Sequence, residues 1–255
     1  MATLFKLGNL TSAVVATALF ASSIEAYDIS PLVLQLDPTG PGSSGSVLIT
    51  NSHTVPIAIE IKLFERTQQA DGSDALVPEK GEFVVIPSQM VIAPGSSQSI
   101  RVQWTGDSSP KKELAYRLVT EQLPIQFDKK VTGDRTFDVK VQYRYEAALY
   151  ISAPNTQPSA NVTSARLSKS ANGEPILELH VANSGKRRAI LNLPKIDIET
   201  GNGAAKVSLS GERVGALNNL NILAESLRVV RLPWPKELPQ GEVTVKLQTG
   251  YASVS

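Results

Sequence analysis

Two stretches of sequence decide the fold: residues 114–124 read LAYRLVTEQLP, and residues 136–154 read TFDVKVQYRYEAALYISAP. In the second stretch apolar residues alternate with polar ones, which is typical of a β-strand with one apolar and one polar face. The apolar positions are Phe137, Val139, Val141, Tyr143 and Tyr145. Proteins usually blunt a long apolar edge strand because it promotes aggregation. One reason to keep such a strand is to add it to the sheet of a partner.

The composition limits the classes of protein to consider. The chain has 255 residues, enough for one large domain or two smaller ones. Its 25 basic side chains nearly balance its 24 acidic ones, which argues against a nucleic-acid partner. Cysteine is absent from the sequence, so the fold depends on its apolar core and not on disulfides.

Residues 1–26 have the features of a secretory signal peptide. Lys6 precedes the apolar run SAVVATALFASS at residues 12–23, which is shorter than the roughly 20 residues of a membrane span. Ile24 and Ala26 are acceptable residues at the −3 and −1 positions, which predicts cleavage after Ala26, so that the mature, exported chain starts at Tyr27. The alternative is a buried N-terminal helix.

Short β-like runs separated by Gly, Pro, Asn, Asp and Ser clusters fill the rest of the chain. In the first half they lie at residues 29–36, 46–50, 57–65, 83–86, 99–104, 116–122 and 137–151. This number and spacing predict an immunoglobulin-like sandwich. Further runs at 164–168, 176–182, 189–193, 206–210, 227–232 and 243–248 predict a second, smaller β-domain. Both halves also contain an Asn followed by a turn after a strand, which suggests related sandwiches.

We therefore predict an all-β protein with two sandwich domains. Residues 153–158 (APNTQP) carry two prolines and predict a short, stiff connection. The expected division is an N-terminal domain at residues 27–153, a linker at 154–158 and a C-terminal domain at 159–255.

Motifs for catalysis or metal binding are missing from the sequence. Neither His53 nor His180 has another His or a Cys nearby, and a metal site would need carboxylates from distant segments, so no metal site is expected. The sequence contains neither a nucleophile elbow nor a glycine loop for phosphate. We predict a protein that is not an enzyme and needs no cofactor.

Arg117 lies within the predicted strand at residues 116–122, between apolar neighbours. An Arg in such a place is costly unless an anion meets it. Arg144 lies in the next predicted strand, which should form a hairpin beside the first. Two guanidinium groups brought together suit a carboxylate ligand. The alternative is that each Arg pairs with an internal acid, such as Glu121 or Glu146.

The order of these segments resembles the periplasmic pilus chaperones of the chaperone–usher pathway, the PapD-like proteins. The resemblance covers nearly all of the mature chain and depends on the spacing of several short motifs. They are Ile29-Ser30-Pro31, residues 47–52 (VLITNS), residues 92–95 (IAPG), Tyr116-Arg117-Leu118, residues 181–185 (VANSG) and residues 221–224 (NILA). The arginine of Tyr116-Arg117-Leu118 looks most like the archaic class of this family.

The resemblance implies two immunoglobulin-like domains in a boomerang arrangement. It also implies that the protein binds pilin subunits in the periplasm and delivers them to an outer-membrane usher. A pilin lacks one strand of its sandwich, and the chaperone supplies it by donor-strand complementation. The donors would be the five alternating apolar residues from Phe137 to Tyr145. An exposed strand of this kind also allows the free protein to self-associate through its edge.

The family further implies a pair of basic residues that anchor the C-terminal carboxylate of the pilin. The first strand of this chain, residues 31–36 (PLVLQL), has no basic residue, which departs from the commoner pattern. Arg117 would take that role. Its partner would come from the donor strand, where Arg144 is the best placed residue and Lys140 the next.

Two other functions remain open from the sequence. A secreted adhesin or carbohydrate-binding protein would use Trp104 or Trp234 as a platform, although both lie near strand ends, where packing is the more ordinary role. A pilin subunit is a third alternative, but such chains usually have one domain and an N-terminal extension.

Overall fold

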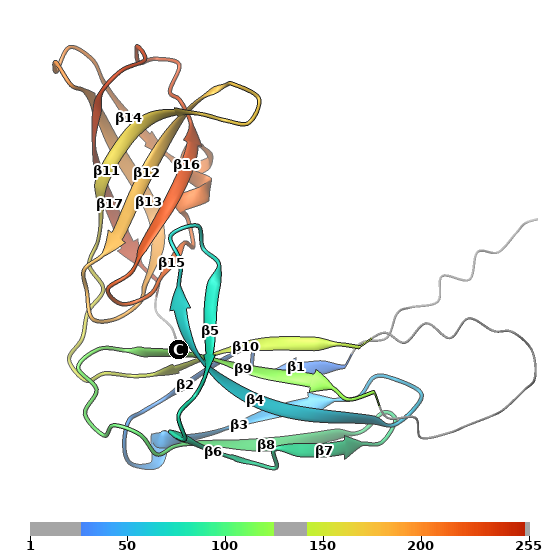
Figure 1. Ribbon diagram of the computed structural model, residues 1–255. Helices are drawn as coiled ribbons and strands as arrows, with labels where there is room; N and C mark the ends of the chain where they lie inside the picture. Colours follow the sequence, from blue (N-terminus) through green and yellow to red (C-terminus); the bar gives the residue numbers. More distant parts are fainter. Residues whose placement is uncertain (1–26, 125–141, 253–255) are drawn as a thin grey trace, which may run out of the picture.

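A computed structural model of the protein describes residues 27–124 and 142–252, which form strands and two short 3-10 helices (Figure 1). The predicted fold class is confirmed. Two immunoglobulin-like β-sandwiches meet at an angle and give the molecule a boomerang outline. Strands β1 to β10 form the N-terminal sandwich, and β11 to β17 form the C-terminal one. No helix in these described ranges is long and apolar enough to cross a membrane.

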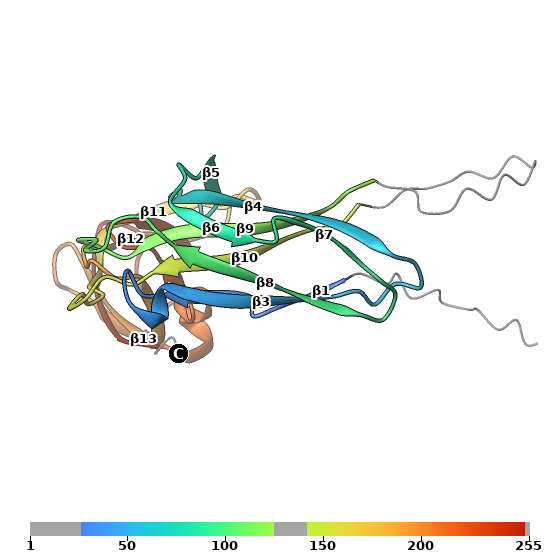
Figure 2. The same cartoon turned by 90° about the horizontal axis from the view of Figure 1, so that it is seen from below.

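The N-terminal domain consists of two sheets packed face to face (Figures 1 and 2). Its elements are β1 (Asp28–Ser30), β2 (Val33–Leu36), η1 (Pro41–Ser43), β3 (Ser44–Thr50), β4 (Ile57–Gln68), β5 (Asp74–Pro78), β6 (Phe83–Ile86), β7 (Gln89–Ile92), β8 (Ser97–Trp104), β9 (Leu114–Gln122) and β10 (Arg144–Ile151). One sheet has the order β1-β3-β8-β6. The other has the order β2-β10-β9-β4-β5, with β7 also paired to β4.

Alternating apolar residues fill the space between these two sheets. Ile49, Ile59, Ile100 and Leu149 come from four different strands, and each of them is 0% exposed. Because successive side chains of a strand point to opposite faces, the polar residues between them lie on the outer faces. The outer face of the sheet with β4, β9 and β10 is turned toward the C-terminal domain (Figure 1). Polar side chains of that face can therefore contact the second domain.

The structure corrects three details of the predicted strands in this domain, one of which is strand β7, which lies between two predicted runs and was missed. The run at residues 29–36 is two strands, because the chain crosses at Pro31 from β1 in one sheet to β2 in the other. Proline has no N–H to give to a ladder, so this position suits a break. Strand β5 was missed because the cluster at residues 70–74 was interpreted only as a turn, whereas Asp74 begins a strand that pairs with β4.

The C-terminal domain is a second sandwich. Its elements are β11 (Ala160–Lys169), β12 (Pro175–Asn183), β13 (Ala189–Thr200), β14 (Lys206–Ser210), η2 (Gly211–Leu217), β15 (Asn221–Ile222), β16 (Leu227–Pro233) and β17 (Val243–Tyr251). The sheet β11-β12-β16 packs on the sheet β14-β13-β15, in which β17 also pairs with β13. Its core includes Leu179, Leu191 and Ile196, all 0% exposed.

Two buried asparagines occupy equivalent places in the two domains. Asn51 follows β3, and its side-chain amide donates to the carbonyls of Val55 and Ile92. Asn183 ends β12, and its amide donates to the carbonyl of Arg187 and to two carbonyls at β15. Each side-chain oxygen accepts the N–H of the residue two positions on. These bonds satisfy backbone groups at a turn, which explains why the same motif follows a strand in both halves.

Candidate interface: an open strand edge beside an arginine cluster

Strand β10 has two halves with different neighbours. Its inner half, Ala148–Ile151, lies between β9 on one side and the parallel strand β2 on the other. Its outer half, Arg144–Ala147, pairs with β9 alone. No strand within residues 27–124 and 142–252 pairs with the second edge of this outer half. β10 is therefore an internal strand at one end and an edge strand at the other.

The backbone groups on the open edge follow from the alternation of the ladder. The carbonyl of Tyr143 accepts the N–H of Gln122 on the β9 side, whereas the N–H of Ala148 donates to Leu32 on the β2 side, at 2.9 Å each. Successive residues of a strand direct their hydrogen-bonding groups to opposite sides. Arg144 and Glu146 therefore present their N–H and C=O groups to the open edge. An unpaired edge of this kind can accept a strand from another chain.

The predicted donor residues divide into two groups. Phe137, Val139 and Val141 lie outside the residues that the structure describes, as does the basic residue Lys140. Tyr143 and Tyr145 are described, and both are half-buried against the core of their own domain. Tyr145 contacts the ring of Tyr27, with 4.7 Å between ring centroids. The alternation predicted from the sequence is thus present at these two positions, where the apolar side faces inward.

Arg117 lies on the face of β9 that is turned toward the C-terminal domain, as the alternation predicts. Its Nε and Nη2 atoms both donate to Oδ2 of Asp74, at 3.1 and 2.7 Å. Glu146 is more distant, with 3.9 Å between its Oε2 and Nε of Arg117. Of the two internal acids considered from the sequence, only Glu146 approaches Arg117, and Asp74 is its principal partner.

Arg66 is a member of this site that the sequence interpretation missed. Its Nε lies 2.8 Å from Oδ1 of Asp74, so that two guanidinium groups share one carboxylate. We call Arg66, Asp74 and Arg117 the arginine cluster. Their side chains are only 7%, 14% and 19% exposed. Arg66 lies on the same face of β4 as Glu60 and Lys62, but Phe64 interrupts the polar pattern, and the predicted strand ended one residue before Arg66.

The arginine cluster is electrostatically unusual because two cations meet a single close anion. Burial raises the pKa of the Asp74 carboxyl, but hydrogen bonds from Arg66 and then from Arg117 outweigh it. The net result is a pKa below the ordinary value of 3.8. Asp74 therefore stays ionised, and the cluster keeps an excess of positive charge. A second carboxylate in this neighbourhood would be stabilised.

Arg144 belongs to the outer half of β10 and has different partners. Its Nε lies 3.3 Å from Glu121, and its Nη2 lies 3.0 Å from Glu146. Both are the internal acids that the sequence offered as the alternative. Arg117 is registered opposite Ala148, four residues along the strand from Arg144, or about 13 Å. The two guanidinium groups lie on the same face, but they flank Glu146 and do not converge on one empty place.

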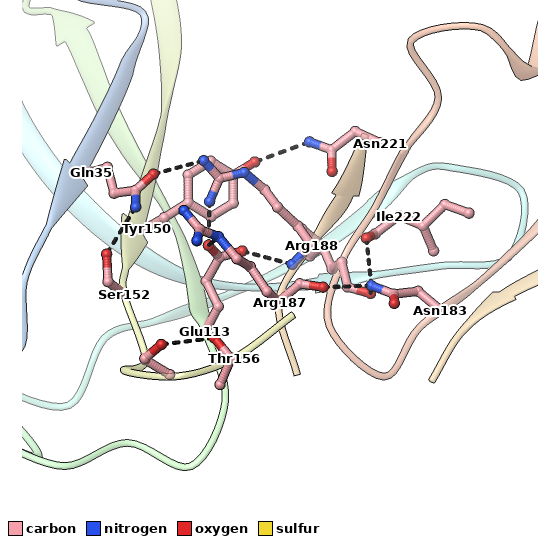
Figure 3. Close-up of polar contacts among 12 residues, drawn as sticks. Gln35, Glu113, Tyr150, Ser152, Thr156, Asn183, Arg187, Arg188, Asn221 and Ile222 are labelled. Carbon is pink, nitrogen blue, oxygen red and sulfur yellow. Dashed lines mark hydrogen bonds and ion pairs between the residues drawn. The ribbon is translucent and has the colours of Figure 1, made fainter. Parts of the chain in front are cut away.

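Contacts between the domains hold this face at a fixed place relative to β13 (Figure 3). The guanidinium of Arg188 pairs with Glu113, donates to Gln35 and lies 3.7 Å from the ring centroid of Tyr150. Arg188 and Glu113 are 1% and 2% exposed at their side chains. A buried pair of this kind is costly to break, because removing one partner leaves an unpaired charge.

The hairpin of β4 and β5 provides a second connection to the C-terminal domain (Figure 1). The amide of Gln68 donates to the carbonyl of Asn221 and accepts the N–H of Leu223. At the tip of the hairpin, the carbonyl of Ala70 accepts the N–H of Val229 at 2.7 Å. Since Asp74 begins β5, the arginine cluster is attached to the same hairpin.

Comparisons with known proteins give the class of this fold. Residues 36–153 match the family model described as "Pili and flagellar-assembly chaperone, PapD N-terminal domain". No protein with a curated description matches the sequence. The crystal structure of the class 5 fimbriae chaperone CfaA is similar, with 18% identity, a TM-score of 0.54 and coverage of 90% of this chain and 94% of that one.

Two structures of complexes contain chains of the same fold. One is a chaperone–tip adhesin complex described as vital for synergistic activation of CFA/I fimbriae biogenesis, with 19% identity, a TM-score of 0.52 and coverage of 90% and 94%. The other is the Salmonella enterica SafA pilin in complex with the SafB chaperone, with 14% identity, a TM-score of 0.50 and coverage of 92% and 95%. At such identities the likeness concerns the fold.

The family match thus covers residues 36–153, which are fewer than half of the 255 residues of the chain. The solved structures share the two-domain fold. The comparisons do not assign the chain to the archaic class, which stays a prediction from the Tyr116-Arg117-Leu118 motif.

Proposed function

We propose that this protein is a periplasmic chaperone that binds pilin subunits by donor-strand complementation and passes them to an outer-membrane usher. The observation that carries the proposal is the open edge of β10 between Arg144 and Ala147, at the end of a segment with alternating apolar residues. The PapD-type match of residues 36–153 supports it. Within the mature chain, residues 27–153 would form the domain that binds the subunit, and residues 159–255 would form the second domain. Residues 154–158 would link the two domains.

The direction of β2 suggests how a pilin strand would lie. β2 is parallel to β10, and its first hydrogen bond joins Leu32 to Ala148. A guest strand that runs in the same direction along Arg144 and Glu146 would end beside Leu32. Its C-terminal carboxylate would then lie near Ala148, the residue registered opposite Arg117.

The arginine cluster fits a carboxylate delivered to that place. Its excess positive charge favours an anion, and a guanidinium can bind a carboxylate through two parallel bonds. We propose Arg117 as the principal anchor, with Arg66 beside it. Arg144 and Lys140 remain proposed contacts farther out along the donor segment.

The apolar donor residues would supply most of the binding energy. Burial of each of Phe137, Val139 and Val141 in the groove of a pilin should contribute roughly 1.5–3 kcal/mol. The three together would contribute roughly 4.5–9 kcal/mol. Ordering a segment on binding generally costs about 2–5 kcal/mol, so the sum outweighs that cost over nearly all of its range. Main-chain hydrogen bonds on the open edge would set the register. This is the chemistry of a binding protein, with no catalytic step.

Co-expression with a pilin subunit encoded beside this gene tests the proposal. The mature protein should co-purify with the subunit, and the double variant Val139→Asp, Val141→Asp should lose it. Val84→Asp is a matched control, since Val84 is 43% exposed on the opposite sheet. Recovery of the complex with the double variant, or its loss with the control alone, would contradict donor-strand binding.

The structure gives less support to the carbohydrate-binding alternative. Trp104 is 3% exposed and Trp234 is 8% exposed. Each indole N–H donates to a nearby carbonyl, that of Asp107 for the first and that of Leu238 for the second. A buried ring cannot stack on a sugar, so neither tryptophan forms the platform that this function requires.

A further inference from the structure

Tyr27 connects three strands at the place where β10 changes from an internal to an edge strand. It precedes β1 directly, yet it is 0% exposed. Its ring meets the ring of Tyr145 edge to face, with 4.7 Å between centroids and 68° between planes. Its hydroxyl donates to the carbonyl of Thr120 at 2.9 Å and lies 2.8 Å from the hydroxyl of the same residue.

These contacts involve one pair of residues that face each other across the antiparallel pairing of β10 with β9. Tyr145 and Thr120 are registered opposite each other in β10 and β9, and Tyr27 contacts both. Thr120 is also 0% exposed, so the hydroxyl group of Tyr27 is satisfied in a dry place. Burial raises the pKa of Tyr27 to about 12, against the opposing effect of its bond to Thr120. The phenol therefore remains a neutral donor throughout the physiological range.

The outer half of β10 has few other contacts to hold it. It pairs with β9 on one side only, and edge strands open more easily than internal ones. The side chains of Arg144 and Glu146 point to the polar face and are exposed. Among the described residues of this half, Tyr145 makes the aromatic contact with the core that counteracts opening.

We propose that Tyr27 is a positioning residue for the donor strand: it retains Tyr145 in the core of its own domain and so fixes where the strand becomes available to a partner. The functional part of this inference rests on the proposed chaperone role. On this view Tyr145, and Tyr143 beyond it, anchor the strand, and the residues given to a subunit lie farther out. A fixed anchor point keeps the register of the donated side chains constant.

Amide hydrogen exchange of the mature protein tests this without any subunit. Tyr145 and Ala147 direct their N–H groups to β9 in the outer half, and Leu149 and Ile151 do so in the inner half. In Tyr27→Phe the first pair should exchange about fivefold faster relative to the second pair, and in Tyr27→Leu the ratio should rise further. Thr120→Val keeps the carbonyl acceptor and loses only the hydroxyl contact, so its effect should be smaller than that of Tyr27→Phe, whereas Thr120→Ser should behave as the wild type.

Tyr116→Phe is the control, because Tyr116 is another buried tyrosine of the same core, bonded to Glu82 and registered opposite Leu149. It should not accelerate Tyr145 and Ala147 selectively. Equal acceleration of all four amides in Tyr27→Phe, or none, would overturn the positioning role. Subunit capture is a separate measurement, so the chaperone role can fail while the exchange result stands.

Discussion

The two halves of β10 share one sequence periodicity but have different surroundings. The inner half is buried throughout, lies between two strands and contacts the C-terminal domain through Tyr150. The outer half has one neighbouring strand, and its residues alternate between half-buried and exposed until Ala147. A single strand can thus be fixed in its own fold at one end and offer hydrogen-bonding groups at the other.

The comparison also shows what keeps the halves different. β2 covers the inner half because the chain crosses between sheets at Pro31, and the preceding strand β1 pairs with β3 instead. The edge beside Arg144 and Glu146 is open as a consequence of that crossing. The arginine cluster lies level with the boundary, since Arg117 is registered opposite Ala148. Each of the following predictions tests one side of this difference.

The largest loss of stability should come from the contact between the inner half and the second domain, where Arg188 lies over the ring of Tyr150. Glu113→Ala leaves Arg188 buried without its ion-pair partner and should cost about 3–5 kcal/mol in the free energy of unfolding. Glu146→Ala, on the outer half, removes an exposed acid and should cost at most about 1 kcal/mol. Urea denaturation measures both. Similar values for the two variants would remove the proposed asymmetry.

Proline substitutions separate the halves through the backbone. Ala148→Pro removes the N–H that donates to Leu32 and should cost on the order of 2–3 kcal/mol. Glu146→Pro removes an N–H that has no partner strand, so the free protein should lose less than about 1 kcal/mol. The Glu146 variant should nevertheless bind a subunit less well. Equal destabilisation by the two prolines would mean that the outer edge is already paired.

The arginine cluster should make stability depend on pH. Asp74 has a folded-state pKa below its ordinary 3.8, so its stabilisation is fully present above that value. The stabilisation is lost as the pH falls through the folded pKa. Asp74→Asn should therefore cost about 1–3 kcal/mol at neutral pH, and this difference should shrink as the pH falls below 3.8. A difference independent of pH would show that the charge of Asp74 does not stabilise the cluster.

The smallest effect on stability is expected at Arg144. Its side chain is 47% exposed, and its partners Glu121 and Glu146 are 33% and 35% exposed. Ion pairs at such sites contribute about 0–1 kcal/mol, so Arg144→Ala should barely change thermal stability. Loss of subunit binding without loss of stability would identify Arg144 as a direct contact. A loss of stability above this range would mean that the pair is structural.

Much of the fold could be predicted because it depends on local patterns. The alternation around Tyr145 identified a strand and its inward face, and the prolines at 154 and 158 lie between the last strand of one sandwich and the first strand of the other. Strand β5 and the division of the first predicted strand could not be predicted. A turn cluster can also contain the start of a strand, and an apolar run can form either one strand or two. Only the pairing of distant segments decides between them.

The candidate site was predictable in part for the same reason. Arg117 was found because an Arg between apolar strand residues requires an anion. Its actual partner, Asp74, lies 43 residues away in sequence and in a segment that was interpreted as a turn. Arg66 was missed together with it, because the two residues meet only when β4 and β5 form their hairpin. Spacing along the chain carries no signal for such a meeting.

The most direct test of the account is amide exchange of the open edge in the presence of a pilin subunit. In the free protein, the N–H groups of Arg144 and Glu146 should exchange rapidly, whereas those of Leu149 and Ile151 should be slow. In the complex, Arg144 and Glu146 should become protected, with little change at the other two. A stable complex in which Arg144 and Glu146 still exchange rapidly would contradict the claim that a partner strand pairs with this edge.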